Sequence, residues 1–178
     1  MTENFRDDTI RPCMSHQPVI DGLEFARTGS KLHGAGSVAG FSRLRDVLRS
    51  DEGTLQYELR GVAQERGYPA LRLKVGGALQ LVCQRCLGAL EFPLRIDVSL
   101  GLAATQAEID AEPLQAEGPE RIVASGEMPV RDLVEDEVLL AIPLAPRHER
   151  CAGRDAGAAS GESSPFAGLR GLVGETRH

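Results

Sequence analysis

The stretch LRLKVGGALQLVCQRCLGALEFPLRIDVSLGL, residues 71–102, decides the fold of this 178-residue chain. Between residues 71 and 83 its large apolar side chains occupy odd positions, and between residues 92 and 102 they occupy even positions. Alternation with a period of two is typical of β-strands that have one buried and one solvated face. The stretch therefore predicts an antiparallel β-meander.

The Gly76-Gly77 pair resembles a two-residue hairpin turn, but parity argues against that interpretation. Such a turn would place Leu73 opposite Gln80 and divide the apolar face between the two sides of the sheet. One long strand bent at the glycines keeps every apolar residue on one side, although a three-residue loop would also satisfy the parity.

Parity also predicts how this strand pairs with the next one. Pairing Cys83 with Phe92 puts both apolar sets on one face and leaves residues 84–91 as a loop at the end of the sheet. An earlier segment, residues 55–59, alternates in the same way and is followed by turn residues at 66–69. We therefore expect at least three consecutive antiparallel strands.

Two segments predict helices that cover the apolar face. Residues 41–50 form an amphipathic pattern in which Ser42 is the expected N-cap. Residues 132–142 form a second pattern, with Asp132 and Glu135 spaced as a capping box and a proline at the end. We interpret Glu135 and the two acidic residues after it as a solvated helix start, because consecutive helix positions point in different directions.

These elements predict an α+β fold: an antiparallel β-meander, partly barrel-like, covered by a few short helices, with flexible acidic and Gly/Ser-rich segments. Residues 1–18 are expected to be a flexible lead-in and residues 19–150 a single domain. That domain includes an acidic loop, residues 105–120, which has five acidic and no basic residues. Residues 151–178 are expected to be a flexible tail with a short C-terminal helical motif.

Charge is distributed unevenly along the chain. Residues 1–100 contain 13 Lys/Arg and 12 Asp/Glu, whereas residues 101–178 contain 7 and 14, which gives the net charge of −6. An acidic chain has no global attraction to RNA, so an RNA contact would need a local basic face. The first 22 residues have no apolar core of a signal peptide, which favours a cytoplasmic protein with no membrane contact.

The motif Cys83-Gln84-Arg85-Cys86 is the sharpest chemical signal. A C-x-x-C pair can bind a metal, cycle through a disulfide, or simply pack in the core. The redox function favours a first cysteine at a helix N-terminus, whereas this pair lies between two strands, as in a zinc knuckle. A structural zinc needs four ligands, and His148 and Cys151 could supply the other two.

Basic residues form the second candidate site. Three of them share the solvated sheet face by parity, one lies in the Cys loop, and three lie on the first predicted helix. In that order they are Arg72, Lys74 and Arg95, then Arg85, then Arg43, Arg45 and Arg49. Such side chains would contact phosphates and position RNA without reading its sequence, but they can equally serve to keep an exposed face soluble. No nucleophile elbow, phosphate-binding glycine loop or HExxH pattern occurs, so we predict neither an enzyme nor a small-molecule substrate.

Four segments, taken in order, resemble the bacterial YceD family. They are VIDGLEFARTG (19–29), LQLVCQRCLGALEFPL (79–94), LVEDEVLLAIPLAPRHERC (133–151) and SPFAGLRGL (164–172). Members of this family are known as large ribosomal RNA subunit accumulation proteins. The resemblance implies a non-catalytic role in the synthesis, processing or stability of large-subunit (23S) ribosomal RNA. The implied partner is this RNA, a precursor particle, or an early assembly protein such as a basic ribosomal protein.

The resemblance does not decide whether this chain binds a metal. Some branches of the family have further C-terminal cysteines that would complete a four-Cys site, whereas this chain has only Cys151 there. Two other functions remain as alternatives. The first is a structural zinc-knuckle adaptor that binds a non-ribosomal protein, and the second is a thiol oxidoreductase, which requires a depressed pKa at one of the two C-x-x-C thiols.

Overall fold

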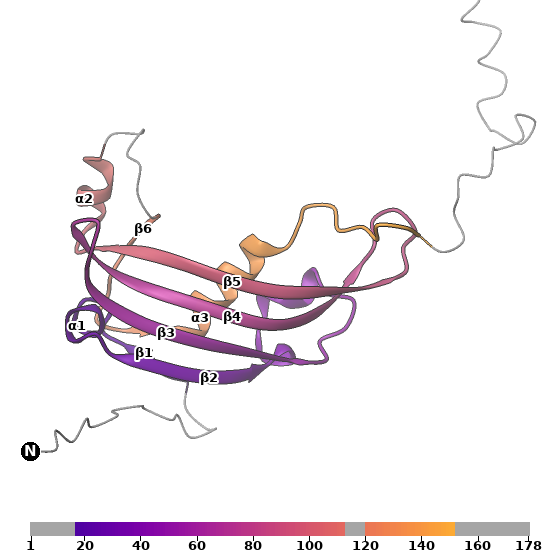
Figure 1. The fold of residues 1–178 in the computed structure, drawn as a ribbon, viewed down its shortest axis with the longest axis horizontal. Coiled ribbons are helices and arrows are strands. Elements are labelled where there is room, and N and C mark those ends of the chain that lie inside the picture. Colours follow the sequence, from indigo (N-terminus) through magenta and orange to yellow (C-terminus); the bar gives the residue numbers. More distant parts are fainter. Residues whose placement is uncertain (1–16, 113–119, 152–178) are drawn as a thin grey trace, which may run out of the picture.

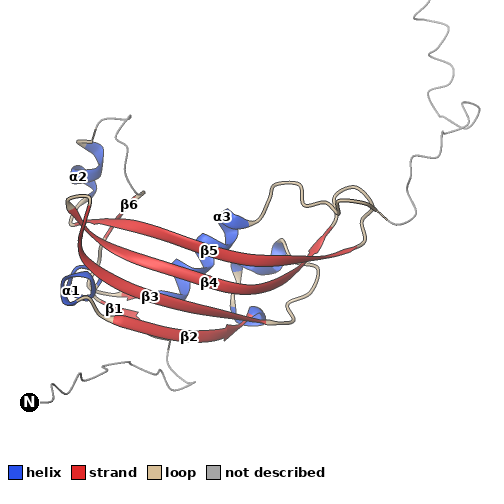
Figure 2. Cartoon of the chain, in the orientation of Figure 1, coloured by secondary structure: helices blue, strands red, loops and turns tan. Residues whose placement is uncertain are grey.

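A curved antiparallel sheet with a helix across one face forms the body of the protein (Figures 1 and 2). The computed structural model describes residues 17–112 and 120–151. The elements are β1 (Val19–Ile20), α1 (Gly22–Thr28), β2 (Lys31–Ser37), η1 (Val38–Gly40), η2 (Arg43–Asp46), β3 (Thr54–Glu65), β4 (Tyr68–Val82), β5 (Ala89–Ala103), α2 (Gln106–Asp110), β6 (Arg121–Val123), β7 (Met128–Pro129) and α3 (Val130–Ala141). The expected lead-in and tail lie almost entirely outside the described residues.

The predicted α+β class and antiparallel meander are confirmed. Strands β2 to β5 follow one another in the order β2-β3-β4-β5, and β6 adds to β5 in parallel at the far edge. The expected barrel-like closure is wrong, because β2 and β6 remain separate edges of an open sheet in the described part of the chain. Closure requires the first and last strands to pair, and the three-residue β6 ends the sheet instead.

The long bent strand is confirmed. β4 has 15 residues and continues through Gly76 and Gly77 without a turn. The turn before β4 lies at Arg66 and Gly67, whose φ angles of 52° and 97° are the positive values that a two-residue hairpin turn requires. The bent strand keeps the apolar side chains of β4 on one face, and its unbroken pairing with β5 excludes the three-residue loop.

The predicted register of the next hairpin is wrong by four residues. Leu79 pairs with Phe92 rather than with Ile96, so β5 begins at Ala89. The loop is shorter than expected because the Cys83 N–H donates to the Gly88 carbonyl at 3.0 Å and closes it. A shift by an even number leaves every side chain on its predicted face, so the parity argument survives the wrong register.

The core lies between this apolar sheet face and the helices. The predicted odd-numbered set of β4 is buried, as are most of the even-numbered residues of β5. The fully buried large side chains are Leu32, Leu44, Leu55, Leu59, Leu71, Leu73, Leu79, Leu81, Leu94, Leu102, Val38 and Val130. At the N-terminal side the two-residue β1 pairs with β7, which lies directly before α3. This pair holds the first described strand against the start of the covering helix.

Both predicted helices differ from expectation at their starts. The segment expected to be a helix over 41–50 contains only the 3-10 helix η2, and Ser42 precedes it without a side-chain cap hydrogen bond. α3 begins at Val130, two residues before the predicted start, so no capping box forms and Pro129 is the N-cap. In the acidic segment 105–120, Thr105 caps the short helix α2 by accepting from the Glu108 N–H. The first part of that segment is therefore helical.

The environment of Glu135 also differs from expectation. Positions 130, 134 and 138 face the core, and Glu135 beside them is buried, with only 3% of its surface exposed. Its carboxylate accepts from the Arg43 N–H at 2.6 Å and from the Leu44 N–H at 3.3 Å. The interpretation of Glu135 as part of a solvated helix start is therefore wrong, because this side chain caps η2 from the covering helix.

One glycine sets how closely α1 packs on β3. A Cβ atom at Gly61 would collide with the backbone carbonyl of Phe25. We expect Gly61→Ala to destabilise the protein by about 3 kcal/mol, near the upper end of typical overpacking costs, and to lower its melting temperature by about 6–12 °C. The control is Gly76→Ala, because a Cβ at Gly76 has no atom within 4 Å. Equal melting temperatures for the two variants would contradict the close approach.

Candidate functional site

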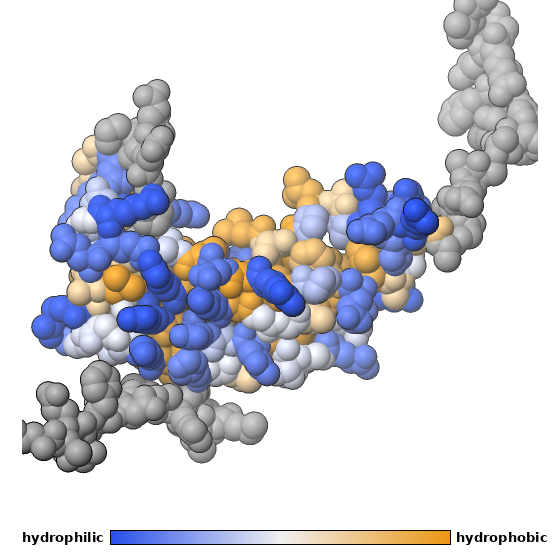
Figure 3. Space-filling model, viewed as in Figure 1, coloured by the Kyte–Doolittle hydropathy of each residue, from blue (hydrophilic) through white to orange (hydrophobic). Residues whose placement is uncertain are grey.

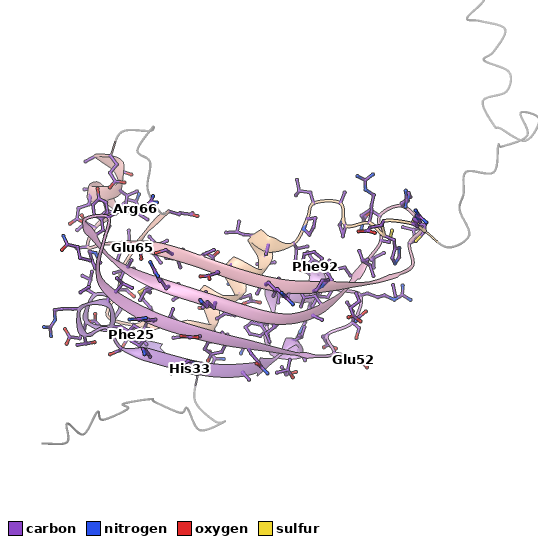
Figure 4. All side chains as sticks on the ribbon, viewed as in Figure 1. Phe25, His33, Glu52, Glu65, Arg66 and Phe92 are labelled. Atoms are coloured by element: carbon purple, nitrogen blue, oxygen red, sulfur yellow. The ribbon has the colours of Figure 1, made fainter. Side chains whose placement is uncertain are left out.

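The loop between β4 and β5 presents two of the predicted metal ligands. It turns back through a Leu87 N–H to Cys83 carbonyl hydrogen bond of 2.8 Å, and Leu87 adopts a left-handed φ of 59°. Cys83 lies at the end of β4 and is fully buried, whereas Cys86 in the turn is partly exposed. Figure 4 shows this end of the sheet opposite the labelled Glu65 and Arg66 at the β3–β4 turn. The C-x-x-C pair thus stands at the tip of a hairpin, as predicted for a knuckle.

The segment that follows α3 returns to the same loop. Gln84 donates its backbone N–H to the Pro146 carbonyl at 2.8 Å. The Arg85 guanidinium donates to the carbonyls of His148 and Glu149 at 3.0 and 3.3 Å. These contacts join residues more than 60 positions apart in the chain. They place the second pair of predicted ligands beside the first.

The four predicted ligand atoms form one cluster. The Sγ atoms of Cys83 and Cys151 are 3.8 Å apart, and the Cys86 Sγ is 3.4 Å from the His148 Nδ1. All four atoms lie within 4.8 Å of one another. Tetrahedral zinc, with bonds of about 2.3 Å to sulfur and 2.0 Å to nitrogen, would space its ligands about 3.5–3.8 Å apart. The cluster could therefore hold a metal ion with little rearrangement.

The orientation of His148 suits a metal ligand. Its Nε2 lies 2.9 Å from the Ala89 carbonyl oxygen. A carbonyl only accepts hydrogen bonds, so Nε2 carries the proton and the Nδ1 lone pair points into the cluster. A histidine ligand whose other nitrogen donates to a carbonyl is the usual outer-shell arrangement of zinc sites. This bond fixes both the tautomer and the ring position before any metal binds.

Electrostatics favour thiolates at two of the three cysteines in the cluster, Cys83 and Cys151. Burial acts to raise the pKa of Cys83, but backbone N–H donors, chiefly that of Cys86, outweigh it and lower the pKa to about 5. The Arg85 guanidinium, whose Nε lies 3.0 Å from Sγ, lowers the pKa of Cys151. At Cys86 the Gly88 N–H lowers the pKa, yet burial and the two neighbouring sulfurs raise it overall. Crowded sulfur ligands of this kind favour a soft cation such as zinc.

The thiol oxidoreductase alternative fits this geometry less well. A depressed pKa at Cys83 is what that alternative requires. However, the side chain of Cys83 is 0% exposed, and the residues that follow it form a loop rather than a helix N-terminus. A buried thiolate has no route to a substrate disulfide, so the cluster resembles a ligand set more than a redox centre.

The predicted basic residues do not form one surface. Arg72, Lys74 and Arg95 lie on the exposed sheet face, much of which is hydrophilic, blue in Figure 3. Arg43 instead contacts α3 on the opposite face, where it pairs with Glu135 and Asp136.

Several of these cations already have partners within the protein. Arg72 pairs with Glu65 at 2.9 Å and Lys74 pairs with Asp97 at 3.4 Å. Arg85 binds the Cys151 segment, and Arg45 donates to the Ala39 carbonyl at 3.2 Å. Within residues 17–112 and 120–151, Arg49 and Arg95 form no ion pair. The basic candidates therefore differ in whether their side chains are available to bind a phosphate.

The strand register reveals a basic row that sequence reasoning missed. Lys31 on β2 lies opposite Arg60 on β3, and Arg60 lies opposite Arg72 on β4. Like charges directly opposite one another destabilise a sheet, so this row is a favourable place for an anion. The sequence could have placed Arg60 on the exposed sheet face, because Arg60 has the same parity as the polar residues of β3. The pairing of Lys31 with Arg60 needed the structure.

Comparison with known protein families identifies the chain. The family model described as "Large ribosomal RNA subunit accumulation protein YceD" matches residues 71–173. This chain belongs to the YceD family. The match begins in β4 and includes the hairpin loop, β5, α3 and all four clustered ligands, so the knuckle lies within the YceD part of the chain. Searches of curated proteins and of solved structures gave no match.

A further observation concerns membranes. In residues 17–112 and 120–151 of this YceD family member, no helix is both long enough and apolar enough to cross a bilayer. The longest described helix, α3, has 12 residues, whereas a spanning helix needs about 20.

Proposed function

We propose that this protein is a non-catalytic, cytoplasmic ribosome biogenesis factor. It supports the synthesis, processing or stability of large-subunit (23S) ribosomal RNA by binding precursor RNA or an early assembly protein. The observation that carries the proposal is the match of more than half of the chain to the YceD family, whose name describes accumulation of this RNA. No small-molecule substrate or membrane contact is part of the proposal.

Phosphate contacts on the exposed sheet face would serve this role. The basic row consists of Lys31, Arg60 and Arg72 at adjacent positions on neighbouring strands, and Arg72 in it also pairs with Glu65. Arg95 lies on the same face without an ion pair in the described residues. Contacts of this kind position RNA and depend on salt. Exposed cations on a sheet also simply solvate it, so the row supports RNA binding without being sufficient for it.

A structural zinc at Cys83, Cys86, His148 and Cys151 is the second part of the proposal. The supporting observation is that three sulfurs and one imidazole nitrogen, contributed by segments far apart in the sequence, lie within 4.8 Å of one another. Zinc accepts a Cys3His set in closed structural sites. Its role would be to hold the segment after α3 against the β4–β5 loop.

The deciding experiment measures the ratio of large- to small-subunit ribosomal RNA in cells that lack this gene. We expect a selective loss of the large-subunit RNA that the intact gene restores, because the family is described by accumulation of that RNA. A variant that removes two charges from the basic row, Lys31→Gln/Arg60→Gln, should restore less of this RNA than the matched variant Arg27→Gln/Arg66→Gln, which removes two charges from exposed positions elsewhere. An unchanged ratio in the deletion strain would contradict the proposed function.

The cysteine cluster also supports a second candidate function. A structural zinc-knuckle adaptor that binds a non-ribosomal protein would need the same four ligands. The two candidates differ in the deletion strain, because loss of an adaptor of this kind would leave the ratio of the two RNAs unchanged. Bound zinc is expected for both candidates, so the RNA ratio is the measurement that separates them.

A further inference from the structure

A groove between β6 and α3 lies on the helix side of the sheet and has no role in the sites described above. Its volume is about 550 Å³. Apolar side chains of β5, β6 and α3 line it, including Leu100, Ile122 and Leu139. Two further apolar residues on its lining are exposed, Leu140 by 70% and Val123 by 40%. Exposed leucine beside an apolar hollow is typical of an interaction site.

The charged residues of this groove are all acidic. Glu120, Asp136 and Glu137 line it, and no Lys or Arg is among its lining residues. Asp136 already pairs with Arg43 at 2.6 Å. In the described part of the chain Glu120 and Glu137 have no ion-pair partner. The groove thus presents an apolar surface with two unpaired carboxylates.

An ionised Glu137 destabilises the fold of the isolated protein. Burial raises its pKa, and repulsion from Glu120 and then Asp136 raises it further. A carboxyl group whose folded pKa exceeds its unfolded pKa binds its proton more tightly in the folded state. Its contribution therefore favours folding at low pH and is lost as the pH rises through the folded pKa. An ionised Glu137 works against folding at neutral pH, and such arrangements occur where function requires them.

We propose that this groove binds a cationic amphipathic segment of a partner protein. Apolar side chains of that segment would lie on Leu140 and Val123, while flanking Lys or Arg side chains would pair with Glu120 and Glu137. Charge complementarity selects this occupant, because three carboxylates repel the phosphates of RNA. The inference deepens the proposed function and rests on it, since it names the kind of assembly partner such a factor would hold.

Site-specific photo-crosslinking tests the proposal. Full-length protein carrying p-benzoylphenylalanine at Leu140 is irradiated with proteins extracted from large ribosomal subunits and, separately, with protein-free large-subunit RNA. The matched control carries the same group at Gln56, an exposed position on the opposite sheet face. We expect position 140 to cross-link to a protein segment in which apolar residues are flanked by Lys or Arg, and position 56 to give no cross-link to such a segment.

Charge variants then test the acidic residues. Glu120→Gln/Glu137→Gln is expected to reduce the cross-link yield on the order of tenfold, because both complementary pairs are lost. Glu52→Gln/Glu91→Gln removes the same charge from exposed positions elsewhere and should leave the yield unchanged. The groove variant should melt no lower than the parent protein, so a lost cross-link cannot be ascribed to unfolding.

Several outcomes would overturn the inference. They are a cross-link from position 140 to RNA, one to residues 165–173 of the same chain, and a yield that does not respond to the groove variant. The ribosomal RNA ratio keeps this failure distinct from that of the proposed function. If the groove variant fully restores the ratio of large- to small-subunit RNA in deletion cells, only the groove inference is contradicted. If deletion of the gene leaves that ratio unchanged, the proposed function is contradicted, and the cross-linking result alone tests the groove.

Discussion

A Cys83→Ser variant is expected to lose its bound zinc and to melt about 10 °C below the parent protein. Metal present at a thousand times its Kd stabilises the folded state by about 4 kcal/mol. In a chain of this length each kcal/mol corresponds to about 2–4 °C. The measurements are elemental analysis of protein purified without chelator and thermal unfolding with and without added zinc.

Two controls separate metal loss from a packing defect, since Cys83 is buried. Cys151→Ser changes a partly exposed ligand and should produce a similar loss, as should chelation of the parent protein. Cys13→Ser alters a cysteine outside the predicted ligand set and should leave both zinc content and melting temperature unchanged. Parent protein free of zinc, or a Cys83→Ser variant with the parent's melting temperature, would contradict the metal site.

The second large effect is expected at Glu135. Replacing Glu135 with alanine would leave the backbone N–H groups of Arg43 and Leu44 without an acceptor at the start of η2. Each unsatisfied buried donor costs about 1–3 kcal/mol. We therefore expect a loss of about 3 kcal/mol in the free energy of unfolding, measured by denaturant titration.

The neighbouring Asp136 provides the matched control. It pairs with the same arginine, Arg43, but its side chain is 54% exposed. Exposed ion pairs contribute less than about 1 kcal/mol, so Asp136→Ala should change stability little. Equal losses for Asp136→Ala and Glu135→Ala would show that the ion pair, rather than the backbone cap, holds η2 against α3.

Most of the sheet was predictable from local pattern. Alternation identified the buried faces of β4 and β5, because the side-chain period of a strand depends only on its own residues. The same pattern excluded a turn at Gly76-Gly77. It could not fix the register, because shifts of two or four residues preserve parity. The register is set by the hydrogen bond from Cys83 to Gly88, which belongs to the loop rather than to either strand.

Errors in the helices have a different physical origin. Asp132 and Glu135 match a capping box by type and spacing, yet α3 starts at Val130 because β7 leads directly into it. Glu135 lies on the face of α3 that packs inward, where it accepts from donors 91 and 92 residues away in the chain. Local sequence contains no sign of such a partner, so a buried acid was interpreted as a solvated one.

The candidate metal ligands were identified by residue type and spacing, whereas their surroundings were not. The C-x-x-C motif and the later His and Cys suggested a shared site, and the structure brings all four together. Arg85 was predicted as a partner-binding residue, and its guanidinium contacts the Cys151 segment. Contacts across more than 60 residues of sequence follow from the fold rather than from any short motif, as do the basic row and the acidic groove.

The pairing of β1 with β7 also delays the completion of the fold during biosynthesis, because the two strands are far apart in the sequence. Ile20 pairs with Met128, and the covering helix α3 follows immediately. At a translation speed of about 5–20 residues per second, Ile20 waits roughly 5–20 s for its partner to be made. In the last part of that interval, after Ala103 and before Met128, the strands β2–β5 have been made but α3 does not yet cover their apolar face. A nascent chain stalled in this interval is therefore the form most in need of a chaperone.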